Sequence, residues 1–121
     1  MVINQGDLFW LDLPEAKGSR PAYSHPCVVV QNDILNHSPI QTTIVCLLTS
    51  NLRRAKSPAN VLLEAGESDL PKSSVVVVTQ MLTVEKADLV NKIGSLSSQR
   101  VQQIINGLHW ILDPDPTFPY Y

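Results

Sequence analysis

Short apolar segments of alternating polarity, separated by turn residues, place the strongest constraint on the fold of this chain of 121 residues. Each segment is rich in Val, Ile, Leu, Thr or aromatic residues, which is the pattern of β-strands. Proline, glycine, asparagine and aspartate mark the stretches between them, and long helical patterns are absent there. Antiparallel hairpins are therefore favoured over βαβ crossovers. The expected strands are 7–13, 27–31, 42–48, 60–63 and 73–80.

The hydrophobic period changes only near the C-terminus. Apolar residues there recur at helical spacing, with Ser97 or Ser98 available as the N-cap and the sequence DPDP to end the helix. We expect an amphipathic helix packed on a small sheet, and a shorter helical turn at 83–90. The apolar stripe consists of Val101, Ile104, Ile105, Leu108, Ile111 and Leu112.

The two tryptophans raise separate questions. Trp10 alternates with Phe9 on the first expected strand, so one of the two belongs to the core and the other can lie on a surface patch. On a helical wheel Trp110 falls opposite the C-terminal apolar stripe. It therefore needs another cover, which could be the C-terminal tail, a second copy of the chain or another protein.

Length and composition predict a single domain over residues 1–121, with a tail rich in proline and aromatic residues at 113–121. No segment reaches the roughly 18 apolar residues of a membrane helix, and the N-terminus lacks the pattern of a secretory signal. We therefore expect a cytoplasmic protein without membrane contact. Cys27 and Cys46 each lie in an apolar run, which favours buried thiols over a disulfide or a metal site.

The formal net charge of −2 argues against a broad basic face that coats nucleic acid, so any contact with RNA must be local. One dense basic cluster follows the strand expected at 42–48. Its members, Arg53, Arg54 and Lys56, could bind phosphates, or they could form a solvated loop, as surface charges commonly do.

Four motifs follow one another along the chain: GDLFWLDLPEAKGS, PCVVVQND, the pair TS after the third expected strand, and LPKSS. Together they resemble the MazF/PemK family of bacterial toxins, and the resemblance covers nearly the whole chain. It implies a mainly β fold, a small SH3-like antiparallel β-barrel of the CcdB/MazF type. It also implies a homodimeric mRNA interferase that cleaves single-stranded RNA at short sequences without a metal or other cofactor, and an acidic antitoxin protein that neutralises it.

The family's functional residues carry over only in part. Thr49 matches the family's catalytic threonine. The principal catalytic arginine of the family, which directly precedes the proline of the second strand, is replaced by His25, and Arg20 stands where a glutamate is common. Leu82 occupies a position that is often arginine in relatives, and Thr79 one that is acidic in some.

Metal-independent cleavage uses the neighbouring 2′-hydroxyl as the nucleophile. The protein must accept its proton, provide for protonation of the leaving 5′-oxygen and stabilise the charge on the phosphorus. A histidine, an arginine and a threonine on adjacent loops can do this, so the candidate catalytic residues are His25, Thr49 and Arg20. The candidate RNA-binding residues are Ser19, Gln31, Asn32, Ser50, Arg53, Arg54 and Lys56.

Three interpretations of the substituted site stay open. His25 could act as the acid or base, while Arg20 supplies the phosphate-stabilising charge from another position in the same loop. Loss of the arginine could instead leave a non-cleaving protein that binds RNA or an antitoxin. The site could also serve a protein target, as in the gyrase-directed CcdB toxins. Three scattered histidines without paired spacing predict no metal site.

Overall fold

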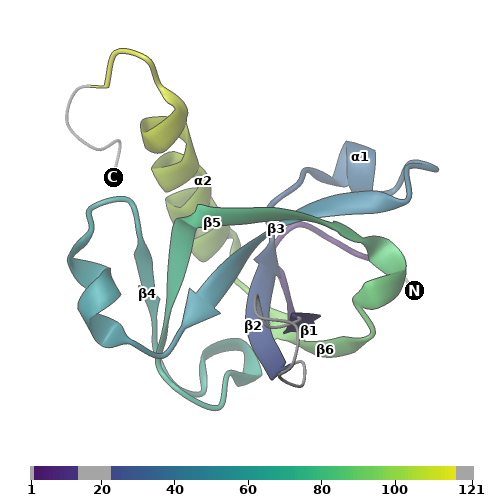
Figure 1. The fold of residues 1–121 in the computed structure, drawn as a ribbon, viewed down its shortest axis with the longest axis horizontal. Helices are drawn as coiled ribbons and strands as arrows, with labels where there is room; N and C mark the ends of the chain where they lie inside the picture. The colour runs from purple at the N-terminus through teal and green to yellow at the C-terminus, as the bar shows by residue number, and fades with distance from the viewer. Residues whose placement is uncertain (1, 14–22, 117–121) are drawn as a thin grey trace.

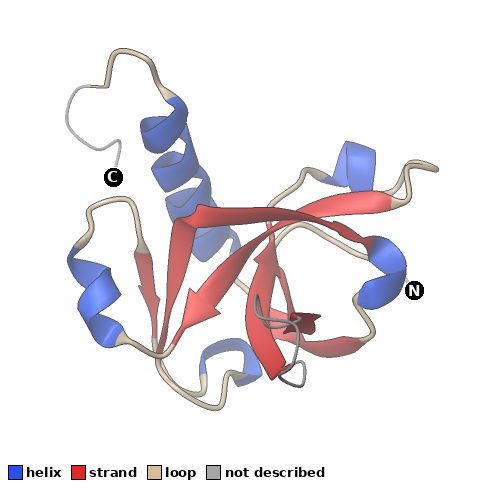
Figure 2. Ribbon diagram, viewed as in Figure 1, coloured by secondary structure: helices blue, strands red, loops and turns tan. Residues whose placement is uncertain are grey.

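Six strands form one curled antiparallel sheet in the order β4-β5-β3-β2-β1-β6, with a helix against one face (Figure 1, Figure 2). The computed structural model describes residues 2–13 and 23–116. The strands are β1 (Asp7–Leu13), β2 (Tyr23–Val29), β3 (Thr42–Thr49), β4 (Val61–Leu63), β5 (Ser74–Glu85) and β6 (Asn91–Ser95). The helices are α1 (Asp33–Asn36) and α2 (Ser98–Leu112), and the 3₁₀ segments are η1 (Leu52–Lys56), η2 (Glu67–Asp69) and η3 (Lys86–Asp88).

The expected fold class is confirmed as this open half-barrel with a C-terminal helix. The five predicted strands are all present, and the side chain of Ser97 caps α2 by accepting a hydrogen bond from the Arg100 amide at 3.2 Å. Three features differ. Strand β2 begins four residues earlier and ends two residues earlier than expected. The sequence pattern missed β6, and β5 runs through the first part of the predicted helical turn, so that only η3 remains helical.

A bulge in β5 produces the curl of the sheet. The partner of Cys46 on β5 is Met81, but the partner of Leu47 is Val77, so the residues 78–80 are inserted on one side of the ladder. Such insertions bend a strand and increase its twist. The first half of β5 can therefore pair with both β4 and β3, while its second half turns away along β3 (Figure 1).

Both faces of the sheet carry apolar side chains, because successive residues of a strand point to opposite faces. Leu8 and Val28 belong to the core under α2, whereas their neighbours Phe9 and Cys27 belong to the core on the other face. The core under α2 also contains Val30, Cys46, Leu48, Leu63, Leu70, Val76, Val78, Ile104 and Leu108. The opposite core also contains Ile3, Leu11, Val29, Val45 and Leu89.

The two cysteines lie in these separate cores and are free thiols. Both side chains are fully buried. Burial raises the pKa of each thiol to about 12, because desolvation disfavours the thiolate. The prediction of buried thiols is confirmed.

Helix α2 contacts the rest of the chain through a glycine. A Cβ on Gly107 would lie 2.2 Å from the Ala59 carbonyl oxygen, so only glycine allows this approach. The side of the helix that carries Gly107 therefore faces the core, whereas Leu112, the last residue of the helix, is 64% exposed. The expectation that Trp110 points away from the core is therefore wrong, since it packs against the core under α2. A helical wheel places the buried side of a helix by its apolar side chains alone, so it did not take account of the close approach at Gly107.

An ion pair ties the first turn of α2 to η2. The Arg100 Nε donates to Glu67 Oε2 at 2.7 Å, and a second guanidinium nitrogen donates to Glu67 Oε1 at 3.1 Å. This hydrogen-bonded pairing lowers the pKa of Glu67 below its ordinary value of 4.5. The contact is bidentate, the geometry in which an arginine and a carboxylate interact best.

The GD pair near the N-terminus closes the turn before β1. Gly6 has φ of +92°, and its amide donates to the Val29 carbonyl at 2.8 Å. The buried Asp7 carboxylate accepts hydrogen bonds from the Asn4 amide at 2.9 Å and the Ser95 hydroxyl at 2.8 Å. This turn thus connects β1 with β2 and β6.

Within residues 2–13 and 23–116, no helix is long and apolar enough to cross a membrane.

We predict that Gly6→Ala destabilises the fold more than Gly66→Ala. Both glycines have positive φ, which costs a residue with a Cβ about 1–2 kcal/mol. Only at Gly6 would the new Cβ meet another atom, the Val101 Cγ2 at 2.7 Å, which adds roughly 1–3 kcal/mol of overpacking. Urea unfolding of the two variants measures the difference. The extra loss should disappear when Gly6→Ala is made in a Val101→Ala background, and equal losses at both glycines would contradict the contact.

We predict that Glu67→Gln loses on the order of 1 kcal/mol of stability at neutral pH. The pKa of Glu67 is lowered in the folded protein, so its stabilising charge is fully present above about pH 5 and is lost as the pH falls through the lowered pKa. The difference from wild type in urea unfolding should therefore shrink between pH 5 and pH 3. Glu85→Gln, at an exposed residue, is the matched control and should show no such trend.

Candidate functional site

The candidate site lies where two neighbouring strands separate. The pairing of β2 with β3 ends at Cys27 and Leu47, although β2 continues along β1 and β3 continues along β5. Extending the register by two residues would set His25 opposite Thr49. Pro26 has no N–H to donate to a neighbouring strand, which favours an end to the pairing here. A gap therefore opens in the sheet at this point.

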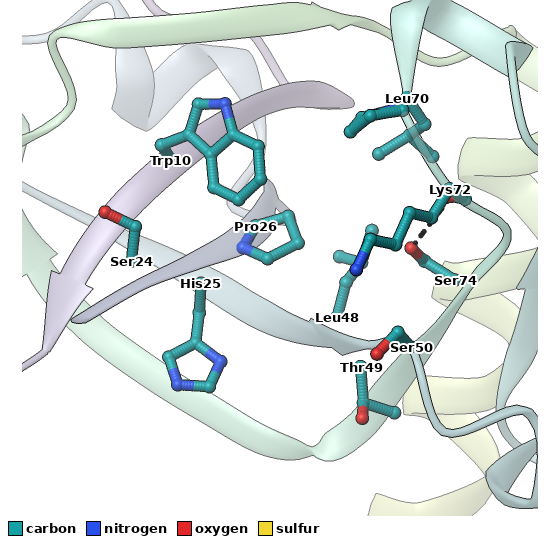
Figure 3. A pocket seen from close by; sticks show the side chains of 11 residues that line it. Trp10, Ser24, His25, Pro26, Leu48, Thr49, Ser50, Leu70, Lys72 and Ser74 are labelled. Carbon is teal, nitrogen blue, oxygen red and sulfur yellow. Dashed lines mark hydrogen bonds between the residues drawn. The ribbon is translucent and has the colours of Figure 1, made fainter.

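A cleft of about 280 Å³ occupies the gap (Figure 3). Its walls come from β1, β2, the end of β3 and the loop that leads into β5. Two buried residues of the core under α2, Leu48 and Leu70, contribute to the lining. The other lining residues are Trp10, Ser24, His25, Pro26, Thr49, Ser50, Pro71, Lys72 and Ser74.

The side chains reach the opening from two sides. Strand alternation assigns His25 and Thr49 to the same face as Cys27 and Leu47, and Trp10 to the face of Leu8. Figure 3 shows the His25 imidazole and the Thr49 side chain at one end of the opening and Trp10 at the other, with the Lys72 ammonium between them. An extended chain passing through the gap would meet all four groups.

Lys72 gives the cleft a positive charge. The buried Ser74 hydroxyl donates to the Lys72 carbonyl at 3.1 Å and fixes the backbone from which this lysine extends (Figure 3). No carboxylate occurs among the described lining residues, and in the same part of the chain no carboxylate lies within ion-pair distance of the Lys72 ammonium. The Lys72 side chain is exposed, so its ammonium can contact an anion that enters the cleft.

Hydroxyl groups supply further hydrogen-bonding capacity. Thr49 Oγ1 accepts from the Asn51 amide at 3.2 Å, so its own hydroxyl proton stays available for donation to a ligand. Ser50 is exposed at the rim, next to Thr49. Ser24 donates its hydroxyl proton to the Asp12 carboxylate. A phosphate group could thus meet hydroxyl donors on the β3 side and an ammonium from the loop before β5.

His25 belongs to a strand rather than to the loop that the sequence suggested. Strand β2 begins at Tyr23 and pairs with β1 across Ser24, His25 and Pro26. A proline is tolerated here because this part of β2 has a partner on one side only. His25 is half-buried and its position is fixed by the ladder, which suits a residue that must hold a defined orientation.

The structure brings together some of the expected site residues and separates others. His25, Thr49 and Ser50 line the cleft. The exposed Arg53, Arg54 and Lys56 lie on η1, which begins two residues after Ser50, and they do not line it. Ser19 and Arg20 lie outside the described residues.

Gln31 and Asn32 follow the other end of β2, and Gln31 lies five residues from Pro26, at most about 17 Å along an extended chain. The Gln31 side chain is buried and donates to Asn36 Oδ1 at 2.9 Å, and Asn32 caps α1 by accepting from the Leu35 amide at 3.0 Å. Both side chains therefore serve the structure around α1 rather than the cleft.

Among the cleft residues that were missing from the expected site, Lys72 and Trp10 have the side chains best suited to bind a ligand. Lys72 stands in the LPKSS motif, and its position between a proline and a strand was the available signal. Trp10 was recognised as one of two possible surface residues. The structure resolves that choice, because Phe9 is fully buried and Trp10 is 36% exposed.

Across residues 2–13 and 23–116, no group of three or more His, Cys, Asp and Glu side chains is placed to hold a metal ion.

Comparisons with known proteins give one consistent result. The family model of the PemK-like, MazF-like toxin of type II toxin–antitoxin systems matches residues 4–112. Endoribonuclease MazF2 of Mycobacterium bovis is 38% identical to the chain over 113 residues, which are 93% of this chain and 99% of that protein.

Two solved structures share the fold. One is a mycobacterial endoribonuclease in complex with its cognate antitoxin, with a TM-score of 0.76 and 18% identity over 94% of this chain and 98% of that chain. The other is MazE–MazF from Deinococcus radiodurans, with a TM-score of 0.77 and 18% identity over 95% of this chain and 99% of that chain.

Proposed function

The chain belongs to the PemK-like, MazF-like toxins of type II toxin–antitoxin systems, and we propose that it cleaves single-stranded RNA in the cleft between β2 and β3. It is an endoribonuclease toxin. One observation supports the cleft as the site of cleavage. An imidazole, an ammonium and hydroxyl groups surround the same opening, and its described lining residues include no carboxylate. A non-cleaving role, including a gyrase-directed one, is not favoured, because the matched relative is an endoribonuclease.

The proposed reaction needs no metal. His25 accepts the proton of the 2′-hydroxyl, whose oxygen attacks the adjacent phosphorus. The bond from phosphorus to the 5′-oxygen breaks, and the 5′-oxygen takes a proton from solvent at the open mouth of the cleft. The products are a 2′,3′-cyclic phosphate and a 5′-hydroxyl.

Lys72 and Thr49 stabilise the charge that develops on the phosphate oxygens during this step. The site lacks the arginine that the family resemblance places at the position of His25, and Leu82 stands at a second position where relatives often have arginine. Leu82 is uncharged and packs against the core opposite α2, so it cannot replace that arginine. Lys72 enters the same cleft from the loop before β5 and supplies a cation from a different element. Arg20, which lies outside the described residues, is the candidate that the sequence suggests for a second one.

We predict that wild-type protein cleaves a long single-stranded RNA in EDTA at a recurring short sequence, leaving 2′,3′-cyclic phosphate ends. His25→Gln should reduce the rate about 10²- to 10⁴-fold, the usual contribution of a general acid or base. Lys72→Met and Thr49→Val should each reduce it about 10- to 1,000-fold, because each removes one stabilising donor. Mapping of fragment ends and single-turnover rates provide the measurement.

Three variants act as controls for this assay. His37→Gln changes an exposed histidine near α1, and Thr83→Val changes an exposed threonine on β5, so both should leave the rate unchanged. Arg20→Met tests whether the chemistry depends on that residue instead. Full activity in both His25→Gln and Lys72→Met would exclude the proposed roles, and absence of cleavage by folded wild type would remove the proposed reaction itself.

We also propose that η1 extends the RNA path beyond the cleft. Its cationic side chains, Arg53, Arg54 and Lys56, are exposed and follow directly on the β3 wall. Exposed cations of this kind bind backbone phosphates. The same charges suit an acidic antitoxin, which would inhibit the toxin by covering η1 and the cleft.

Replacement of Arg53, Arg54 and Lys56 by Gln should weaken RNA binding and make it less dependent on salt. Each phosphate contact of a single strand contributes about −0.7 to the slope of log K against log salt concentration, so loss of three contacts should flatten it by about 2. The double variant Arg53→Lys/Arg54→Lys keeps the charge and should keep the slope. An unchanged slope in the neutral variant would place the RNA elsewhere.

We further propose a cytoplasmic homodimer as the active form. This rests on membership of the family and on the expectation from the sequence. Light scattering at micromolar concentration tests it, and a monomer mass would remove the dimer from the proposal.

A further inference from the structure

Trp10 is a large aromatic residue that the mechanism above does not use. It lies on β1 on the same face of the sheet as Leu8, but Leu8 is fully buried, whereas Trp10 is 36% exposed. The difference arises because Trp10 reaches past the core under α2 and forms a wall of the cleft. A half-exposed indole in a cleft can bind a flat partner.

The surroundings of Trp10 suit one nucleotide. Pro26 lies opposite Trp10 in the pairing of β1 with β2, and both residues line the cleft. Figure 3 shows the indole ring beside Pro26, with the Lys72 ammonium across the opening. A flat apolar wall next to a cation matches the two parts of a nucleotide, its base and its phosphate. The cleft, with a volume of about 280 Å³, offers room for such a group.

We propose that Trp10 forms a base-stacking subsite that holds an unpaired nucleobase next to the scissile phosphate. The inference rests on the proposed function and adds a ligand contact to the same cleft. A base in a duplex is already stacked on both faces, so the subsite accepts only a nucleotide that is single-stranded or unstacked. Since every base has an aromatic face, stacking here favours single strands without selecting one base strongly.

The charge of the cleft favours a nucleotide over an apolar peptide side chain. Lys72 extends into the same opening, and a bound apolar side chain would make no charge-assisted contact with its exposed ammonium. A nucleotide brings that anion with the base. Trp10 is thus a positioning residue for the substrate, and a protein occupant is an outcome that the experiment below can reveal.

The test measures binding of a non-cleavable single strand, the 2′-deoxy analogue of an RNA that wild-type protein cleaves. Trp10→Leu should weaken its binding about 5- to 150-fold, which corresponds to the contribution of one stacked base. Trp10→Phe keeps an aromatic face and should stay within about threefold of wild type. An analogue with an abasic site at the stacked position should bind wild type as weakly as the intact strand binds Trp10→Leu.

Tryptophan fluorescence gives an independent readout. The chain has two tryptophans, and Trp110 packs against the core under α2 rather than in the cleft. Trp110→Phe therefore leaves Trp10 as the reporter, and its emission should be quenched when the analogue binds. If Trp110→Phe does not fold, the quenching of wild type should be absent in Trp10→Phe.

The possible outcomes separate this proposal from the proposed function. If wild type cleaves RNA and binds the analogue, but Trp10→Leu binds equally well and no quenching occurs, the stacking subsite is wrong and the nuclease stands. The same conclusion follows if Trp10→Leu loses only the binding of an acidic antitoxin or of a second copy of the chain. If folded wild type neither binds nor cleaves RNA, both proposals fall together.

Discussion

The end of the pairing between β2 and β3 is the constraint on which the site depends. As far as Cys27 and Leu47 the two strands form an ordinary antiparallel pair, and beyond that point each keeps only its other neighbour. Had the ladder continued, His25 and Thr49 would be a cross-strand pair, and backbone hydrogen bonds would close the space that the cleft now occupies. The functional groups are therefore held by complete ladders on their outer sides while facing an opening on the inner side. This arrangement combines fixed side-chain positions with access for an extended chain.

The periodicity of apolar residues predicted the strands and the helix that depend on neighbouring residues in the sequence. Alternating polarity identified five strands, and helical spacing after Ser97 identified α2. The missed strand β6 and the long second half of β5 form because other strands offer them partners, which a segment cannot show in its own composition. The orientation of α2 depended on Gly107 and its approach to Ala59, a contact with a residue far away in the sequence. For the same reason the surroundings of Trp110 could not be predicted from a helical wheel.

The candidate site was predictable where a motif carried it. Thr49 and His25 were identified from their positions in the motifs of the family resemblance, and both line the cleft. Lys72 and the exposure of Trp10 depend on which strands separate and on which loop then reaches the gap, and these are properties of the assembled sheet. Gln31 shows the opposite error. A polar residue at a strand end suggested a base contact, but its side chain donates to Asn36 at the end of α1 and to the Thr42 carbonyl at the start of β3, which only the folded chain places beside it.

The position of β5 within the sheet has a consequence for aggregation. Its first half contains Val75–Val78, a run of buried β-branched residues of the kind that forms cross-β stacks when it becomes a free edge. In the native sheet β3 covers one side of this run, and the other side is covered by β4, a strand of only three residues. So short an edge offers little template to another molecule, which protects the native protein. Local opening of β4 would, however, leave the backbone groups of this apolar strand unpaired and able to bind another chain. The shortest strand of the sheet thus protects the native protein from aggregation through β5.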